Sequence, residues 1–311
     1  MTVLDLVVRR STEVADGIRE LELAAADGGA LPAHPAGSHL VLECGGARNA
    51  YSLTNVGRDP LRYTIAVLRR PDGRGGSRYL HGLRPGDRVA ASRPRSAFAP
   101  VTTARKHLLI AGGIGITPLL AHVRDAARWG REVELLYAHR PGAGAFVDEL
   151  ASRLGPRFGR TTDRVAFRAA LAAALTTQPL GTHLYVCGPE PLTDRVLGDA
   201  ARAGWVPQRL HRERFAAVEP PPGRPFVARL ARSGRDVAVP SGTSLLDALR
   251  AAGVDVPNLC RQGLCGECRV PVLAGVPLHR DEYLTDDERA AGDAMLSCIS
   301  RCDSDGLTLD L

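Results

Sequence analysis

The sequence lacks the features that membrane, exported and nucleic-acid-binding proteins need. Its 311 residues contain no run of about eighteen or more apolar residues, so no transmembrane helix is expected. Asp5, Arg9 and Arg10 stand where a signal peptide has an apolar stretch, so we expect a cytoplasmic protein. Aromatic residues make up only 5%, and the basic residues, nearly all Arg, are scattered. The net charge of +6 therefore predicts a solvated surface and no nucleic-acid partner.

The chain also has no internal repeat and no low-complexity segment. Its length and its 44% hydrophobic content predict two or three domains. Residues 218–225, VEPPPGRP, contain four prolines and one glycine, which neither a helix nor an inner strand tolerates. We predict a linker there, with domains at residues 1–102, 103–217 and 226–311.

Short alternating runs punctuated by Gly and Pro dominate the first hundred residues. They cover Leu4–Val8, Ile18–Leu23, His39–Leu42 and Tyr63–Val67. Alternation of apolar and polar residues is typical of strands with one buried face. We therefore predict a small antiparallel β-barrel.

The pattern changes from Lys106 onward. An apolar strand over His107–Ala111 is followed by a glycine turn, a helical stretch over Pro118–Trp129 and a strand over Glu132–Tyr137. This order predicts a βαβ unit and an α/β domain with a parallel sheet. The tail is predicted to hold two strands and a helix over Ser244–Ala252, followed by a cysteine-rich loop.

Four of the seven cysteines follow one spacing. Cys260, Cys265 and Cys268 form C-x4-C-x2-C, and Cys298 follows after 29 further residues. This spacing is that of plant-type [2Fe-2S] ferredoxins. The alternative is a structural zinc site, which usually uses two C-x2-C pairs, whereas the chain has one.

Two further details refine this metal site. Gly263 and Gly266 permit tight turns whose N–H groups can point at sulfur. Cys302 competes with Cys298 as the fourth ligand, but the turn at Ser297–Cys298 is nearer the end of a predicted Asp-rich helix over residues 285–292. We therefore choose Cys298.

The glycine turn Ala111-Gly-Gly-Ile-Gly-Ile-Thr-Pro118 follows a strand and opens a helix. Backbone N–H groups in such a turn can approach a pyrophosphate. Pro118 replaces the third glycine of the G-x-G-x-x-G fingerprint, so on spacing alone a plain strand-to-helix turn is equally favoured.

Three further segments accompany this turn: Tyr51-Ser52-Leu53 on an early strand, Gly75-Gly76-Ser77 before a short helix ending near Gly82, and Tyr185–Pro189 at a strand end. Taken singly, Tyr51 is better read as a core aromatic and Cys187 as a buried small residue. In this order, however, the segments resemble the ferredoxin-reductase superfamily. The domain order resembles the phthalate dioxygenase reductase and vanillate demethylase reductase family over essentially the whole chain.

The resemblance implies a flavin-binding barrel, an NADH-binding α/β domain and an α+β (β-grasp) plant-type ferredoxin domain, with FMN as the flavin. It implies that Tyr51 packs on the isoalloxazine, that Ser52 lies near N5, and that Phe215 covers the ring. The implied catalytic residues are Ser52, Thr117, Cys187 and Phe215. The implied cofactor-binding residues are Arg48, Asn49, Tyr51, Ser52, Leu53, Ala66, Val67, Gly75, Gly76, Ser77, Gly113, Gly115, Thr117, Arg140, Cys187 and Gly188.

The chain departs from the family at one position. The family pattern R-x-Y-S has Arg two residues before Tyr, whereas here Asn49 stands there and Arg48 is displaced by one. A phosphate needs a charge-assisted donor nearby. Arg48 from the next position, or one of Arg69, Arg74 and Arg78, remain the alternatives.

Three cofactors together imply an electron-transfer enzyme. Nicotinamide delivers two electrons, a [2Fe-2S] cluster accepts one, and a flavin can mediate between them. The chain has no C-x-H…C-x2-H motif of a Rieske centre, so we expect a separate acceptor, by resemblance a Rieske-type oxygenase component. The alternatives are a cytochrome P450 or another acceptor, or a non-enzymatic zinc-binding module.

Arg140 follows the strand ending at Tyr137, where a 2′-phosphate would be met and no acidic residue stands, which favours NADPH. The resemblance favours NADH, which we prefer. The histidines, among them His34, His39 and His122, are expected to be surface or ordinary polar residues with no metal-binding pair.

Overall fold

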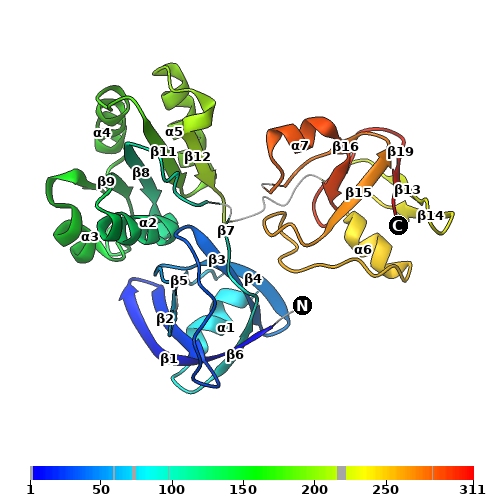
Figure 1. Ribbon diagram of the computed structural model, residues 1–311, viewed down its shortest axis with the longest axis horizontal. Coiled ribbons are helices and arrows are strands. Elements are labelled where there is room, and N and C mark those ends of the chain that lie inside the picture. The colour runs from blue at the N-terminus through cyan, green and yellow to red at the C-terminus, as the bar shows by residue number, and fades with distance from the viewer. Residues whose placement is uncertain (1–2, 59, 72–74, 97, 216–221, 282) are drawn as a thin grey trace. The chain divides into compact units, whose positions relative to one another are not determined.

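The computed structural model describes residues 3–58, 60–71, 75–96, 98–215, 222–281 and 283–311 (Figure 1). The chain divides into two compact units, Met1–Phe215 and Ala216–Leu311. The first contains an antiparallel barrel and an α/β domain, and the second a mixed sheet with its own helices.

The barrel is a seven-stranded antiparallel sheet with the order β4-β3-β6-β1-β2-β5, and β7 pairs with β3. An isolated bridge between Leu53 and Ile65 joins the β4 end of this order to β5, which closes the barrel. Apolar side chains such as Leu21, Leu40 and Tyr63 fill its interior. The elements are β1 (Leu4–Ala15), β2 (Ile18–Ala25), β3 (Ser38–Cys44), β4 (Ala47–Ser52), β5 (Tyr63–Leu68), α1 (Gly76–Gly82), β6 (Arg88–Ala91) and β7 (Arg95–Ser96).

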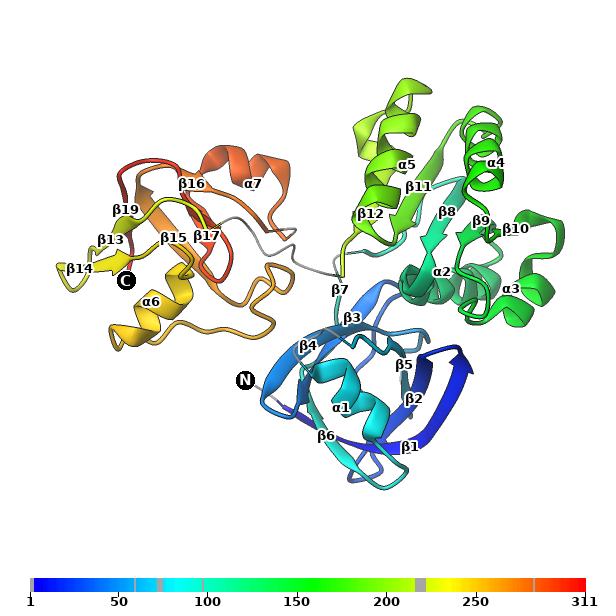
Figure 2. The ribbon, with the colours of Figure 1, turned by 180° about the vertical axis from the view of Figure 1, so that it is seen from behind.

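The α/β domain is a five-stranded parallel sheet with the order β10-β9-β8-β11-β12. Helices cover both faces of this sheet (Figure 2), so β8 is buried along its whole length. Leu109 and Ala111 pack in the core formed with α2 and α3, and Leu108 and Ile110 pack in the core formed with α4 and α5. The elements are β8 (Lys106–Gly112), α2 (Ile116–Trp129), β9 (Glu132–Ala138), α3 (Val147–Leu154), β10 (Phe158–Thr161), α4 (Arg164–Thr176), β11 (Thr182–Cys187), α5 (Glu190–Arg202) and β12 (Leu210–Glu213).

The second unit is a mixed sheet with the order β14-β13-β19-β15-β17, in which only the central β13 and β19 run parallel. Helix α6 packs its apolar side on this sheet, as in a β-grasp fold. The elements are β13 (Phe226–Leu230), β14 (Arg235–Val239), α6 (Leu245–Ala251), β15 (Arg269–Ala274), β16 (Pro277–Leu278), α7 (Asp286–Ala291), β17 (Ala294–Leu296), β18 (Arg301–Cys302) and β19 (Gly306–Leu309).

Both helices of this unit begin where side chains cap them. Ser244 accepts a hydrogen bond from the Asp247 N–H at the start of α6, and Thr285 and Glu288 form a capping box at α7. Gly292 ends α7 in the left-handed conformation. The predicted helices over Ser244–Ala252 and 285–292 therefore include the capping residues of the observed ones.

The predicted linker lies partly outside the described residues, which exclude 216–221. Its last part belongs to the second unit. Gly242 N–H donates to Pro222 O, and the Arg301 guanidinium donates to the carbonyl oxygens of Arg224, Pro240 and Thr243. The buried Arg301 side chain thus fixes the chain entering β13. The domain boundaries themselves stay predictions.

The three predicted folds are confirmed, but several histidines differ from expectation. His107, His122 and His211 pack around the Tyr185 ring, and His183 stacks on His211, with the His183 Nδ1 and His211 Nε2 atoms 2.9 Å apart. His122 is 1% exposed and its Nε2 lies 2.8 Å from Phe98 O. His107 and His122 are thus core residues, and the partly exposed His211 and His183 extend this layer of rings, which we call the histidine layer, toward the surface. Over the described ranges, no helix has the length and apolar character needed to cross a membrane.

Candidate functional site

Strand β4 presents two different faces. Asn49 and Tyr51 share one side, since side chains alternate along a strand, and the Tyr51 hydroxyl is hydrogen-bonded to Asn49 and Cys44. Tyr51 packs against the barrel core with its ring partly exposed. Arg48 points the other way and is opposite Glu43, with Nε and Nη2 at 3.0 and 2.7 Å from Oε1. Asn49, and not Arg48, therefore lies on the tyrosine side.

The turn before α1 lies directly on Asn49. Gly75 has φ 93°, and a Cβ added at Gly76 would be 1.9 Å from Asn49 Nδ2. Ser77 Oγ accepts a hydrogen bond from Arg70 N–H at 3.1 Å, which ties the turn to the end of β5. The turn has the glycines that close backbone approach requires.

The other proposed flavin contacts on the barrel are mostly core residues. Leu53 and Val67 are buried in the barrel interior, so only their backbone is available to a ligand. Ala66 faces the α/β domain instead. Arg69 and Arg78 remain candidate phosphate donors, and Arg74 lies outside the described residues.

Two glycine turns meet at the carboxyl ends of neighbouring strands β8 and β11. A Cβ added at Gly115 would lie 2.2 Å from Cys187 O, and one at Gly188 would lie 3.0 Å from Gly112 Cα. Backbone thus packs on backbone, and the carboxyl edge of a parallel sheet is where α/β domains bind ligands. Gly113 has φ 53°, and Thr117 Oγ1 donates to Ile114 O at 3.0 Å, so Thr117 braces the turn.

Ser52, Cys187 and Glu213 meet at the junction of the barrel and the parallel sheet. Cys187 is opposite Glu213 in the β11–β12 register, and the Glu213 carboxyl is hydrogen-bonded to Ser52. Burial raises the pKa of Glu213 to about 8, although the Ser52 hydrogen bond lowers it. Its Oε2 atom is buried with no hydrogen-bond partner in the described structure. A neutral carboxyl of this kind can hold a proton at neutral pH.

Glu213 is a site residue that the sequence interpretation missed. The available signal was its place at the end of the last strand, immediately before Arg214-Phe215. Phe215 itself is partly buried against the α/β core, and Arg140 is exposed just after β9. The roles predicted for these two residues stay predictions.

The cysteine loop lies between α6 and β15. It contains two glycines in the left-handed conformation, and neighbouring atoms leave no space for a side chain at either one. Gly263 and Gly266 have φ 72° and 76°. An added Cβ would lie 2.8 Å from Ile299 Cγ2 at Gly263 and 2.3 Å from the Tyr283 ring at Gly266. Arg261 in the same loop also has a positive φ, 55°, which is uncommon outside glycine.

The four predicted metal ligands are arranged in two pairs. The thiols of Cys260 and Cys265 interact with one another, and so do those of Cys268 and Cys298. The Cys265 thiol and the N–H groups of Gln262 and Leu264 lower the pKa of Cys260 to about 6, which favours a thiolate.

This pairing fits two irons better than one zinc. A [2Fe-2S] cluster needs two ligands on each iron, whereas structural zinc needs four around one ion. The Cys302 thiol instead donates to Ser304 O at 3.0 Å.

Family models match both units. Residues 88–210 match the dimethylamine monooxygenase subunit DmmA-like N-terminal domain, and residues 228–303 match the 2Fe-2S iron-sulfur cluster binding domain. The fold and the cysteine loop therefore define an electron-transfer oxidoreductase with a C-terminal [2Fe-2S] domain.

Whole-chain relatives narrow this class. The chain is 45% identical to the heme-dependent oxidative N-demethylase beta subunit of Ectopseudomonas mendocina, covering 100% of this chain and 99% of the relative. It is 39% identical to the vanillate O-demethylase oxidoreductase of a Pseudomonas species, strain HR199, covering 99% and 100%.

A solved structure agrees with these relatives. Phthalate dioxygenase reductase, described as a modular structure for electron transfer from pyridine nucleotides to [2Fe-2S], superposes with a TM-score of 0.74 at 35% identity, covering 99% of this chain and 98% of that one. The chain belongs to this family of reductase components of oxygenase systems. The predicted enzyme class and separate oxygenase partner are thereby confirmed.

Proposed function

We propose that the protein takes a hydride from NADH onto FMN and passes single electrons through its [2Fe-2S] cluster to a separate oxygenase component in the cytoplasm. The observation that carries this proposal is the meeting of Ser52, Cys187 and Glu213 between the barrel and the carboxyl edge of the parallel sheet. The flavin supplies the change from two-electron to one-electron transfer when bound.

The residues around this junction have distinct roles in the proposal. Tyr51 and Phe215 would flank the flavin ring, Ser52 would contact its reactive edge, and Asn49 with the turn Gly75-Gly76-Ser77 would hold its phosphate. The turn at Gly113 and Gly115 with Thr117, together with Cys187 and Gly188, accommodates the nicotinamide. The close contacts at Gly115, with the Cys187 backbone, and at Gly76, with the Asn49 side-chain amide, support these assignments, because neither glycine leaves room for a side chain of its own.

Spectroscopy of the purified protein tests the proposal. We expect flavin absorbance with a broader iron-sulfur contribution, released FMN on denaturation, and anaerobic bleaching of both on adding NADH. A preparation with no visible absorbance, or one whose absorbance NADH leaves unchanged, would contradict the proposal.

Comparing kcat/KM for NADH and NADPH decides the coenzyme, and an Arg140→Ala variant shows whether that exposed cation favours NADPH.

The acceptor has two candidates. We favour a Rieske-type oxygenase component, in line with the phthalate dioxygenase and vanillate demethylase systems. A heme-dependent oxygenase is the second candidate, because a relative at 45% identity is the beta subunit of a heme-dependent N-demethylase. Anaerobic mixing of the NADH-reduced protein with a purified component of each kind, followed by the acceptor's own absorbance, separates them.

Glu213 predicts a pH dependence. With a pKa raised to about 8, the buried carboxyl is neutral below that pH and becomes an anion above it. A buried anion beside the flavin opposes the negative charge that reduction adds, so we expect flavin reduction by NADH to fall up to about tenfold per pH unit above pH 8. Stopped-flow measurements over pH 6–10 check this.

The matched variants for this prediction are Glu213→Gln and Glu190→Gln. Glutamine keeps the shape of the carboxyl and cannot ionise, so Glu213→Gln should flatten the profile. Glu190 is an exposed carboxylate at the start of α5, and its variant should keep the wild-type profile. A sloping profile in Glu213→Gln would remove Glu213 from this role.

A further inference from the structure

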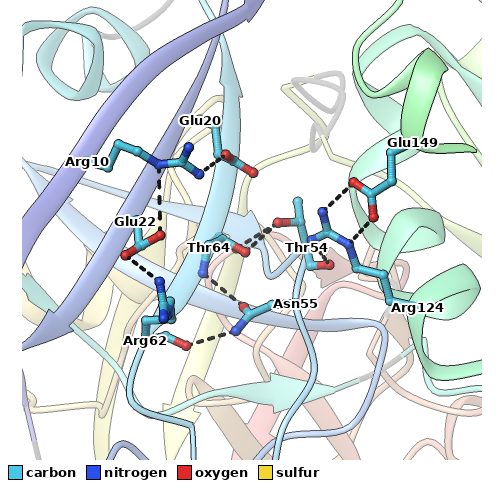
Figure 3. A network of polar contacts seen from close by, with 9 residues as sticks. All are labelled: Arg10, Glu20, Glu22, Thr54, Asn55, Arg62, Thr64, Arg124 and Glu149. Carbon is cyan, nitrogen blue, oxygen red and sulfur yellow. Dashed lines mark hydrogen bonds and ion pairs between the residues drawn. The ribbon is translucent and has the colours of Figure 1, made fainter. Parts of the chain in front are cut away.

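The Arg124 guanidinium connects the barrel to two helices of the α/β domain (Figure 3). Arg124 lies on α2. Its Nε and Nη2 donate to the two carboxylate oxygens of Glu149 on α3 at 2.9 and 2.7 Å. Its Nη1 donates to the carbonyl oxygen of Thr54 in the barrel at 2.9 Å. One rigid, planar group therefore fixes three segments at once.

This contact is stronger than a typical surface ion pair. The Arg124 and Glu149 side chains are only 21% and 27% exposed, and the pair is bidentate. Burial raises the pKa of Glu149, but the hydrogen bonds and charges of Arg124 and Arg153 outweigh that effect and lower it overall. Glu149 is therefore ionised at neutral pH and holds the guanidinium in one orientation.

The barrel end of the contact is equally constrained. Thr54 is fully buried, its N–H donates to Thr64 O at 2.8 Å, and its hydroxyl is 2.7 Å from that of Thr64. Asn55 adds hydrogen bonds to Thr64 N–H and Arg62 O. Thr54 comes two residues after Ser52, so fixing its carbonyl also fixes the end of β4.

Helix α2 connects Arg124 to the glycine turn at its start, which forms the nicotinamide side of the proposed site. Arg124 follows Thr117 by seven residues, about two turns, so both lie on the same side of α2. The turn that opens α2 packs on the Cys187 carbonyl through Gly115. A rotation of α2 relative to β4 would change the spacing between Ser52 and the Gly115–Cys187 contact.

We infer that Arg124 is a positioning residue for hydride transfer. It sets the distance between β4, which would contact the flavin, and the turn with Gly113, Gly115 and Thr117, which would contact the nicotinamide. This inference rests on the proposed function. A misplacement of about 1 Å at reacting atoms can cost on the order of 100-fold in rate. Arg124 touches neither reacting group, and its effect passes through Thr54 and α2.

Three variants test it in the holoprotein. Arg124→Gln removes the guanidinium group, Arg124→Lys keeps the charge but cannot reach all three acceptors, and Arg153→Gln is the control. Arg153 pairs with the same Glu149 oxygen at 2.8 Å and is more exposed. We measure flavin content, the rate constant of flavin reduction at saturating NADH, its dependence on NADH concentration, and hydrogen exchange of the Thr54 and Thr64 amides.

We expect Arg124→Gln to slow flavin reduction at saturating NADH at least tenfold, with unchanged flavin content and a half-saturating NADH concentration within about twofold of wild type. The Thr54 and Thr64 amides should exchange faster. Arg124→Lys should lie between, and Arg153→Gln should match wild type. These amides report on the barrel contact independently of turnover.

Two results would overturn the inference. One is wild-type reduction in Arg124→Gln and Arg124→Lys. The other is equal slowing in Arg153→Gln, which would show that Glu149 pairing only stabilises the fold. Failure of the proposed function looks different, because the wild-type protein itself would then hold no flavin or would not be reduced by NADH.

Discussion

Replacing Cys298 by serine is expected to leave the purified protein with almost none of the roughly two iron atoms per chain that a [2Fe-2S] cluster holds. The Cys298 thiol is paired with that of Cys268, so serine removes one of the two sulfur ligands on the same side of the site. Electron transfer to the oxygenase should be lost, while NADH still bleaches the flavin, because the proposed flavin site lies in the other unit.

Cys302→Ser is the matched control. The Cys302 thiol is also buried but is directed at Ser304, and serine can replace it in that hydrogen bond. We expect normal iron content and the unchanged iron-sulfur absorbance. Iron analysis and visible spectra of both variants decide the point. Full iron in Cys298→Ser would rule out Cys298 as a ligand, and iron loss confined to Cys302→Ser would make Cys302 the fourth ligand.

Acid should destabilise the α/β domain strongly, because its histidine layer is built from neutral rings. Burial lowers the pKa of His122 to about 3 and that of His211 to about 4, and it also lowers the pKa values of His107 and His183. Unfolded histidines titrate near 6.5, so this contribution to stability is complete above that pH and is lost as the pH falls toward the folded-state values.

The expected size follows from linkage. Between pH 7.5 and pH 5, His122 alone should lower the free energy of unfolding by about 2 kcal/mol, and the other histidines add in the same direction. Urea unfolding at several pH values measures this. His122→Gln should reduce the slope with pH, even if it lowers stability at pH 7.5 through the contact with Phe98 O. An identical slope in that variant would contradict the assignment.

Local spacing predicted the parts of the site whose geometry is set within a few residues. Cys260, Cys265 and Cys268 fall in one loop, and the glycine turn opening α2 is a short segment with its own conformation. The antiparallel barrel and the parallel sheet were predicted for the same reason, because strands and helices each impose a characteristic spacing of apolar residues on the local sequence. Strand β1 was predicted too short, at Leu4–Val8, because the register shifts between Val8 and Arg10 and no residue beyond Val8 is buried, so the apolar alternation stops although the strand continues to Ala15.

The missed residues depend on which segments lie side by side. Glu213 joins the proposed site because β12 pairs with β11, and Arg124 because its guanidinium reaches the Thr54 carbonyl, 70 positions away in the chain. The histidine layer likewise comes from one helix and three strands. Nothing in the sequence near these residues specifies such neighbours, so the histidines were predicted to be surface or ordinary polar residues.

The pairing of Cys268 with Cys298 has a consequence for chain entropy. A metal ion joining these thiols closes a loop of about 30 residues that contains β15, α7 and β17. By the relation used for disulfides, closing a loop of this length removes on the order of 4 kcal/mol of unfolded-state entropy. A chain that lacks this cross-link would unfold more often and would then be degraded by proteases more often. The supply of iron would therefore set the lifetime of the ferredoxin domain in the cell.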